Sequence, residues 1–293
     1  MKTNRARRFA DQGTSTCAMS KRVLTAPENA VLGCAAGTIE VTILQPMLYL
    51  KNATQQGLPM TLDPRLLYRG LFASVMNMSI LTGLQFPLTG LVSSAITGGA
   101  ERRLTDSEMI GSGFVGGALS GFACGPMELV MIQQQRFGGG ILATPPKIMA
   151  DHGGARALFR SVSMACGREG LFAAGYLGIG PVLSRRLVED HGLADGTADV
   201  AGAVGAGVIA ASLSHPMDTI KTCMQGDLGG AKYGGVGATG RTLMAESGVG
   251  AFFRGWSWRT GRMICAVFIM GQCKKQLTPI LFPDPEGGAG DEQ

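Results

Sequence analysis

One pattern occurs three times in this chain: a proline followed directly by methionine, with a glutamine nine positions after the proline. The copies are 80 and 90 residues apart, and a long, largely apolar segment precedes each one. Such a period indicates a structure built from repeated supersecondary units. The three copies are PMLYLKNATQ from Pro46, PMELVMIQQQ from Pro126 and PMDTIKTCMQ from Pro216.

A second element recurs after each copy: an aromatic residue, an arginine, and a glycine or serine, at 68–70, 159–161 and 253–255. Another apolar stretch follows each time. Each unit therefore predicts a proline-kinked helix, a loop with a short helix, and a second long helix. We expect six long helices, with both chain ends on one side, near residues 28–56, 70–97, 107–137, 160–190, 198–225 and 254–282.

The composition places these helices in a membrane. Only 16% of the residues are charged, whereas a soluble domain has about 25%. The 45 glycines suit membrane helices, which approach each other closely through small residues. Each apolar stretch is interrupted by glycine, proline or a charge, which is typical of helices that surround something polar. The predicted fold is an all-α membrane protein with three repeats, at 28–100, 101–195 and 196–282.

Few features indicate chemistry beyond this bundle. The seven cysteines form no CxxC or CxxH pattern, so we expect no disulfide framework, metal site or cofactor. The glycines at 138–140 lack the strand and lysine of a phosphate loop, and we expect neither an enzyme nor a nucleic-acid-binding protein. The basic segment 1–27 is either a transit peptide or a disordered arm; we favour the arm because no amphipathic stripe is present. An acidic, glycine-rich tail follows at 283–293.

The two recurring elements resemble the signature of the mitochondrial carrier family, Pro-x-acid-x-x-base-x-x-x-Gln followed by an aromatic-basic-Gly element. The resemblance covers residues 28–282, and the third copy is complete. It implies a pseudo-threefold bundle of six membrane helices with short matrix helices, in the inner mitochondrial membrane. A central substrate site would open alternately to either side. The complete third copy comprises Pro216, Asp218, Lys221, Gln225, Glu246, Gly248, Phe253, Arg254 and Gly255.

In that family, the acid of one copy pairs with the base of another and closes the matrix side, braced by the glutamines. The third pair is missing here, because Leu48 and Met131 stand at its positions. Losing both charges together avoids an unpaired buried charge. The alternative is that the remaining charges only snorkel to the interface. The implied gate residues are Lys51 with Asp218, Glu128 with Lys221, and the braces Gln55, Gln135 and Gln225.

The cytosolic end departs further from the family. An aromatic-acid-x-x-base motif is expected near the ends of the even helices, but no charged pair is found there. The acid positions fall at Gly90, Pro181 and Lys274, and the base positions at Ser93, Ser184 and Leu277.

Charges within a membrane span are functional candidates by default, and five qualify: Glu40, Arg168, Glu169, Arg259 and Arg262. The family's substrate contacts lie seven residues past the aromatic-basic-Gly element, at Asn77, Arg168 and Arg262, with Glu169 beside them. An Arg followed by an acid there resembles amino-acid carriers. Arg168 or Arg262 would hold a carboxylate and Glu169 an ammonium. The alternative is a self-satisfied Arg168–Glu169–Arg262 cluster that only joins helices. Glu40 lies one position off the expected cavity line.

Two functions follow from these observations. The first is a carrier of the inner mitochondrial membrane for a small-molecule substrate, an amino acid or related small carboxylate. The second is a carrier-fold subunit of a respiratory or other inner-membrane complex, with transport weakened or lost. The resemblance also implies cardiolipin or another anionic lipid near Arg69, Arg160 and Arg254, although ordinary positive-inside flanking charge explains much of the same pattern.

Overall fold

The structure is a computed structural model that describes residues 26–98, 102 and 104–282. Residues 1–25 of the predicted arm and the predicted tail at 283–293 lie outside the described residues. Every regular element in the described part is helical. The six long helices begin and end within three residues of the predicted bounds, which confirms the all-α class.

The three repeats share one order: a long helix, a short helix and a second long span. The first consists of α2 (Ala26–Gln56), α3 (Pro64–Leu67) and α4 (Leu71–Thr97). The second consists of α5 (Asp106–Phe137), α6 (Thr144–Asp151), η1 (Gly154–Phe159), α7 (Val162–Ala173), η2 (Ala174–Ile179) and α8 (Gly180–His191). The third consists of α9 (Asp195–Gly226), α10 (Val236–Ser247), η3 (Gly248–Phe253) and α11 (Trp256–Leu281).

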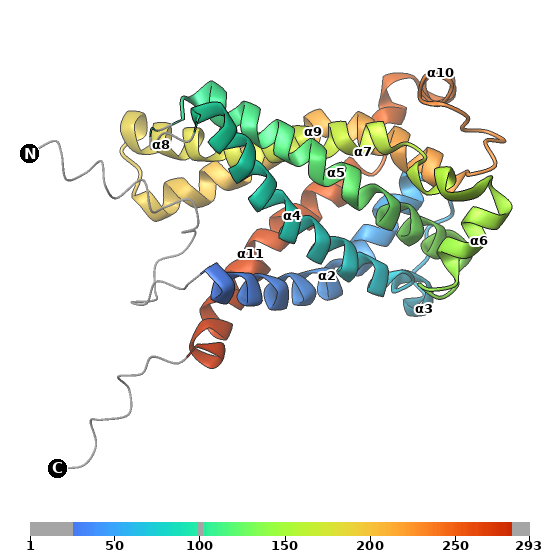
Figure 1. Cartoon of the computed structure of the whole chain (residues 1–293), viewed down its shortest axis with the longest axis horizontal. Coiled ribbons are helices and arrows are strands. Elements are labelled where there is room, and N and C mark those ends of the chain that lie inside the picture. The colour runs from blue at the N-terminus through green and yellow to red at the C-terminus, as the bar shows by residue number, and fades with distance from the viewer. Residues whose placement is uncertain (1–25, 99–101, 103, 283–293) are drawn as a thin grey trace, which may run out of the picture.

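The long helices form a closed ring. Each one packs on the next in chain order, and α11 returns to pack on α2. Figure 1 shows α3, α6 and α10 at one end of the bundle, which we call the short-helix end, and the start of α2 and the end of α11 at the other. The helices that carry the repeat proline, α2, α5 and α9, also contact one another, so they meet inside the ring.

The fourth span differs from the single helix predicted at 160–190. It is divided into α7, the π-helical turn η2 and α8. Pro181, in the first turn of α8, has no N–H and its ring clashes with the carbonyl four residues earlier. A π-helical turn placed before it accommodates both effects within one continuous span.

Four helical stretches of the described part are long and apolar enough to cross a membrane by themselves. They are Val31–Gln56, Pro64–Thr97, Asp106–Phe137 and Gly196–Gly226. The remaining two spans, α7–α8 and α11, carry the arginines of the candidate site, which lowers their mean hydropathy. Such charges are tolerated where they face the interior of a bundle.

Small residues set the distance between α5 and α7. Gly113, Gly117 and Gly121 recur every fourth residue on α5 and lie against Ala165 and Ala173 of α7 or the backbone beside them. A methyl group at Gly121 would lie 2.8 Å from the carbonyl oxygen of Ala165. The close approach therefore requires glycine, as expected for helices that pack by contact rather than by hydrophobic exclusion of water.

The residue before each repeat proline ties the kinked helix to the aromatic-basic-Gly element. Gln45 Nε2 donates to the Arg69 carbonyl at 3.1 Å, and His215 Nε2 donates to the Arg254 carbonyl at 3.0 Å. In the middle repeat this residue is Gly125, which has no side chain to donate. There the hydroxyl of Ser161 donates to the Arg160 carbonyl instead, at 2.5 Å.

The third residue of the aromatic-basic-Gly element caps the following helix in the left-handed conformation. Gly70 has φ 75°, Ser161 φ 63° and Gly255 φ 77°. This region is open to glycine and costs other residues about 1–2 kcal/mol. At Gly255 a methyl group would also lie 3.0 Å from the carbonyl oxygen of Lys51, so glycine is required there both for the backbone conformation and for space.

Gly255→Ala is therefore expected to lower the free energy of unfolding by about 1–2 kcal/mol. The matched control is Gly240→Ala, in the interior of α10, where a methyl group meets nothing within 4 Å. That control should stabilise the protein by about 0.5–1 kcal/mol. Thermal unfolding of the two purified variants measures both effects. Equal melting temperatures would contradict the assigned role of Gly255.

Candidate functional site

Two ion pairs lie where α2, α5 and α9 meet. Lys51 Nζ on α2 lies 2.6 Å from Asp218 Oδ2 on α9. Lys221 Nζ on α9 lies 2.9 Å from Glu128 Oε2 on α5. All four side chains are buried. The structure thus brings together both pairs that the family resemblance implied.

The third predicted position is apolar. Met131 is buried with Ala73 and Ile132, and Leu48 packs against this cluster. Here α2 and α5 meet through hydrophobic contact, where the other two junctions use charge. The arrangement agrees with the joint replacement of an acid and a base.

The three glutamines behave differently from one another. Gln55 Nε2 donates to Asp218 Oδ2 at 2.9 Å, so it braces the first ion pair. Gln135 accepts from Asn52 Nδ2 at 2.6 Å, and Gln225 Nε2 lies 3.5 Å from the Gly125 carbonyl. Among the described residues neither of these two bonds to an ion pair. The stronger link between α5 and α9 comes from Gln133, whose Nε2 donates to the Gln225 carbonyl at 2.6 Å.

Arg168 on α7 joins the ion pairs to the predicted substrate contact. Its Nη2 lies 2.6 Å from Glu128 Oε1 and also contacts Glu169. Its Nε lies 3.7 Å from Asp218 Oδ1 and has no hydrogen-bond partner. The predicted gate and part of the predicted substrate site are therefore one connected group of side chains.

Arg259 on α11 belongs to the same group. Its Nη1 lies 3.5 Å from Asp218 Oδ2, and its Nη2 donates to Ser214 Oγ at 2.7 Å. We call the connected group the central charge network. It holds four cationic and three anionic side chains, so its formal net charge is +1. Its members are Lys51, Glu128, Arg168, Glu169, Asp218, Lys221 and Arg259.

Arg262 lies outside this network. Its Nη2 is 2.8 Å from Glu40 Oε1, which joins α11 to α2. The Arg168–Glu169–Arg262 cluster considered from the sequence therefore does not form: Arg168 and Glu169 are in contact, but Arg262 pairs with Glu40. Glu40 is 1% exposed, and its second oxygen, Oε2, has no hydrogen-bond partner within the described part of the chain.

Asn77, the predicted contact on α4, is partly buried, and its Oδ1 has no hydrogen-bond partner in the described part of the chain. The structure does not connect it to Arg168 or Arg262. It stays a predicted contact that supplies a neutral polar group.

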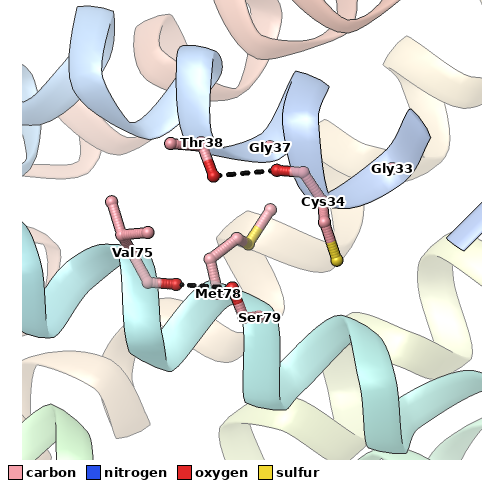
Figure 2. Close-up of a pocket in the computed structure, with 7 residues that line it drawn as sticks. All are labelled: Gly33, Cys34, Gly37, Thr38, Val75, Met78 and Ser79. Carbon is pink, nitrogen blue, oxygen red and sulfur yellow. Dashed lines mark hydrogen bonds between the residues drawn. The ribbon is translucent and has the colours of Figure 1, made fainter. Parts of the chain in front are cut away.

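The pocket between α2 and α4 is not a candidate for the substrate site. Figure 2 shows the hydroxyls of Thr38 and Ser79 bonded within their own helices, to the carbonyls of Cys34 and Val75. The space measures about 10 Å³, roughly the room needed for one water molecule. It reflects loose packing beside Gly33 and Gly37.

Comparison with known proteins agrees with this architecture. The model of the family described as mitochondrial carrier protein matches residues 195–283. A mitochondrial glycine transporter of Yarrowia lipolytica is 24% identical over 271 residues, which cover 80% of this chain and 88% of the relative. An uncharacterized mitochondrial carrier of Schizosaccharomyces pombe, C19G12.05, is 24% identical over 276 residues, covering 87% and 94%. Residues 195–283 thus match the mitochondrial carrier family, and the chain as a whole resembles members of that family at low identity.

The human electrogenic aspartate/glutamate antiporter SLC25A12 is 28% identical over 202 residues, which cover 67% of this carrier but only 29% of the antiporter. The matched region thus covers most of the length of the glycine transporter and less than a third of the length of the antiporter. The family match and these relatives indicate a multi-pass solute carrier of the inner mitochondrial membrane rather than an enzyme. The resemblance to the carrier family implies that the short-helix end is the matrix end.

The arginines of the three aromatic-basic-Gly elements differ in their freedom to bind lipid. Arg160 of the carrier donates to the carbonyls of Met224, Tyr233 and Gly234, at 3.1, 2.7 and 2.8 Å. Its guanidinium thus holds the loop of the next repeat. The side chain of Arg69 makes no hydrogen bond within the described residues.

Arg254 is held by an acid of the same repeat. Its Nη1 donates to Glu246 Oε2 at 2.7 Å. The hydrogen bond from Lys232, aided by the one from Arg254, lowers the pKa of the Glu246 carboxyl below its usual value, although burial opposes the shift. Because the folded pKa is depressed, this contribution to stability is present at neutral pH and is lost as the pH falls through it.

The cytosolic end shows no ion pair at the positions of the family motif among the described side chains; that of Lys274 lies outside them. Ser184, at one of the predicted base positions, instead hydrogen-bonds to Asp199 of α9. Arg185 and Asp106 pair nearby at 2.7 Å, but both are about half exposed. Exposed pairs of this kind contribute little to stability.

The sequence-based prediction named Glu40 and Arg259 as charged residues within membrane spans but assigned them no partner. An alignment of the three repeats distinguishes both residues from their counterparts. Six residues before the prolines, Glu40 corresponds to Ser120 and Ala210. Three residues before the contact positions, Arg259 corresponds to Ser74 and Ala165. A charge where the other repeats hold a small residue marks a departure from threefold symmetry.

Proposed function

We propose that this carrier transports an amino acid or a related small carboxylate by alternating access. The observation that supports this most is the net charge of +1 on the buried central charge network. An uncompensated cation in a low-dielectric site is costly, and the carboxylate group of a bound substrate offers it a counter-charge. The names of two relatives, a glycine transporter and an aspartate/glutamate antiporter, agree with a carboxylate-bearing cargo.

Two arginines are suited to hold the carboxylate, Arg168 and Arg262. Each has a buried Nε that bonds to none of the described residues, and a guanidinium binds a carboxylate through two parallel N–H groups. Asn77 adds a neutral polar contact and no charge, which disfavours cargo with a cationic side chain. In the sequence-based prediction Glu169 accepts the ammonium.

The same contacts supply a physical route to alternating access. Arg168 binds Glu128, which is also the partner of Lys221. A substrate carboxylate that engages Arg168 competes with Glu128 and so weakens the contact between α5 and α7. The gate would then consist of the two ion pairs with the contact between Leu48 and Met131. Gln55, Gln135 and Gln225 would lie beneath them.

Reconstitution tests this proposal. Wild-type carrier in liposomes should take up at least one labelled amino acid from a panel of amino acids, keto acids and nucleotides. Competition by the corresponding carboxamide should be weak. Arg168→Lys keeps the charge but removes the fork, and it should reduce competition by the carboxylate roughly tenfold or more, the value of one charge-assisted hydrogen bond. Arg186→Lys, exposed on α8, is the matched control and should match wild type.

The alternative is a structural subunit of a larger inner-membrane complex. The missing charge pairs at the cytosolic end favour it, because a gate without them closes only by apolar contact. Co-purification with a respiratory complex, together with no uptake of any panel solute, would replace the transport proposal by this one.

We further propose that cardiolipin or another anionic lipid binds at the matrix end. Arg69 supports this best, because its guanidinium has no hydrogen bond within the described residues. Arg160 and Arg254 would act through the adjacent helix N-termini, since their guanidinium groups already hold carbonyls or a carboxylate.

A further inference from the structure

We infer that Glu40, rather than Glu169, accepts the ammonium group of the substrate, and that Glu40 and Arg262 together form a clasp for a zwitterion between α2 and α11. This inference rests on the proposed function and specifies its cargo: a substrate with a carboxylate and an ammonium on the same carbon atom.

The hydrogen bonding of the pair supports the inference. Glu40 Oε1 accepts from Arg262 Nη2 at 2.8 Å. This single bond leaves Glu40 Oε2 and Arg262 Nε buried and without partners among the described residues. One acceptor and one donor thus lack a partner within the same ion pair. The ammonium of an amino acid matches the first and its carboxylate the second.

The burial and position of the two side chains indicate how the substrate is oriented. The Arg262 side chain is 27% exposed and the Glu40 side chain 2%, so a ligand reaches the arginine first and the acid behind it. Arg262 follows Arg259 by three residues, about 4.5 Å along the helix. The carboxylate end would therefore lie toward the positively charged network and the ammonium end toward Glu40.

Glu169 is less suited to this role. It contacts Arg168, its neighbour in sequence, which is also bound to Glu128. An ammonium at Glu169 would have to share the carboxylate with this arginine. The Glu40–Arg262 pair is neutral and separate, so a zwitterion of zero net charge replaces one ion pair by two without leaving a charge behind.

The position of Glu40 also argues against a purely structural role. The matching positions in the other repeats, Ser120 and Ala210, are buried and small, which shows that the helix contact does not need a charge. A carboxylate in a membrane span costs at least about 2.5 kcal/mol. A residue retained at that cost is expected to meet a ligand.

The test compares an amino acid with its des-amino analogue as competitors for uptake in liposomes, with glycine and acetate as the first pair and the other amino acids of the panel as further pairs. Wild type should prefer the amino acid. Glu40→Gln keeps the size of the side chain and a hydrogen bond to Arg262. It should lower this preference roughly ten- to hundredfold, with competition by the des-amino acid nearly unchanged. Glu169→Gln should keep the preference.

Two further variants serve as controls. Glu189→Gln, exposed on α8, is matched in chemistry and should behave like wild type. Glu40→Asp retains the charge and should keep most of the preference, which separates loss of charge from misfolding. If Glu40→Gln loses affinity for both competitors equally, or keeps the preference, Glu40 only joins two helices and the inference is wrong. If wild type itself shows no preference for any amino acid, the proposed amino-acid cargo fails first.

Discussion

Asp218→Asn is expected to be the most damaging single substitution in the carrier. The Asp218 carboxylate lies within 3.7 Å of four cations, from Lys51 at 2.6 Å to Arg168 at 3.7 Å, and accepts from Gln55. Asparagine leaves Lys51 buried without a counter-charge. Removing one partner of a buried ion pair costs about 3–5 kcal/mol.

The measurement is thermal unfolding in detergent, together with uptake in liposomes. The melting temperature should fall by roughly 5–10 °C, and uptake should be lost. Asp151→Asn makes the same chemical change at an exposed position on α6 and should alter neither property. A variant as stable as wild type would show that Lys51 can move to the interface, as in the snorkelling alternative.

At the apolar junction, a second substitution should restore part of the stability that the first one removes. Leu48→Asp places a carboxylate against the cluster of Ala73, Met131 and Ile132, where it has no cation. It should destabilise the carrier by about 3–5 kcal/mol. Adding Met131→Lys supplies the base at the position where the other repeats hold Lys51 and Lys221, and part of the loss should return.

The double-mutant cycle for this pair requires both single variants, the double variant and wild type under one condition. Residues in direct contact show coupling of about 0.5–3 kcal/mol, and we expect a value within this range that favours the double variant. Strict additivity would mean that positions 48 and 131 do not face each other, and the threefold pairing scheme would then hold only for its two charged members.

The repeat pattern by itself determined the helical class and the six spans, and its resemblance to the carrier signature implied the two ion pairs. It could do so because each copy carries its own backbone signals: a proline inside a helix, and a glycine or serine with positive φ before the next helix. These signals are local, and three copies in register fix which residues occupy equivalent places. The pairing of Lys51 with Asp218 was implied by the family resemblance applied to those equivalent places, without knowledge of any distance.

Only the tertiary structure decided the features that the three repeats do not share. The π-helical turn of the fourth span, the bond from Gln133 to α9 and the Glu40–Arg262 pair occur once each. None has a counterpart in another copy from which it could be predicted. Glu40 and Arg262 are 222 residues apart, and their contact depends on how α11 closes the ring against α2. A contact between helices depends on the rotation and crossing of both, which the spacing within either one does not specify.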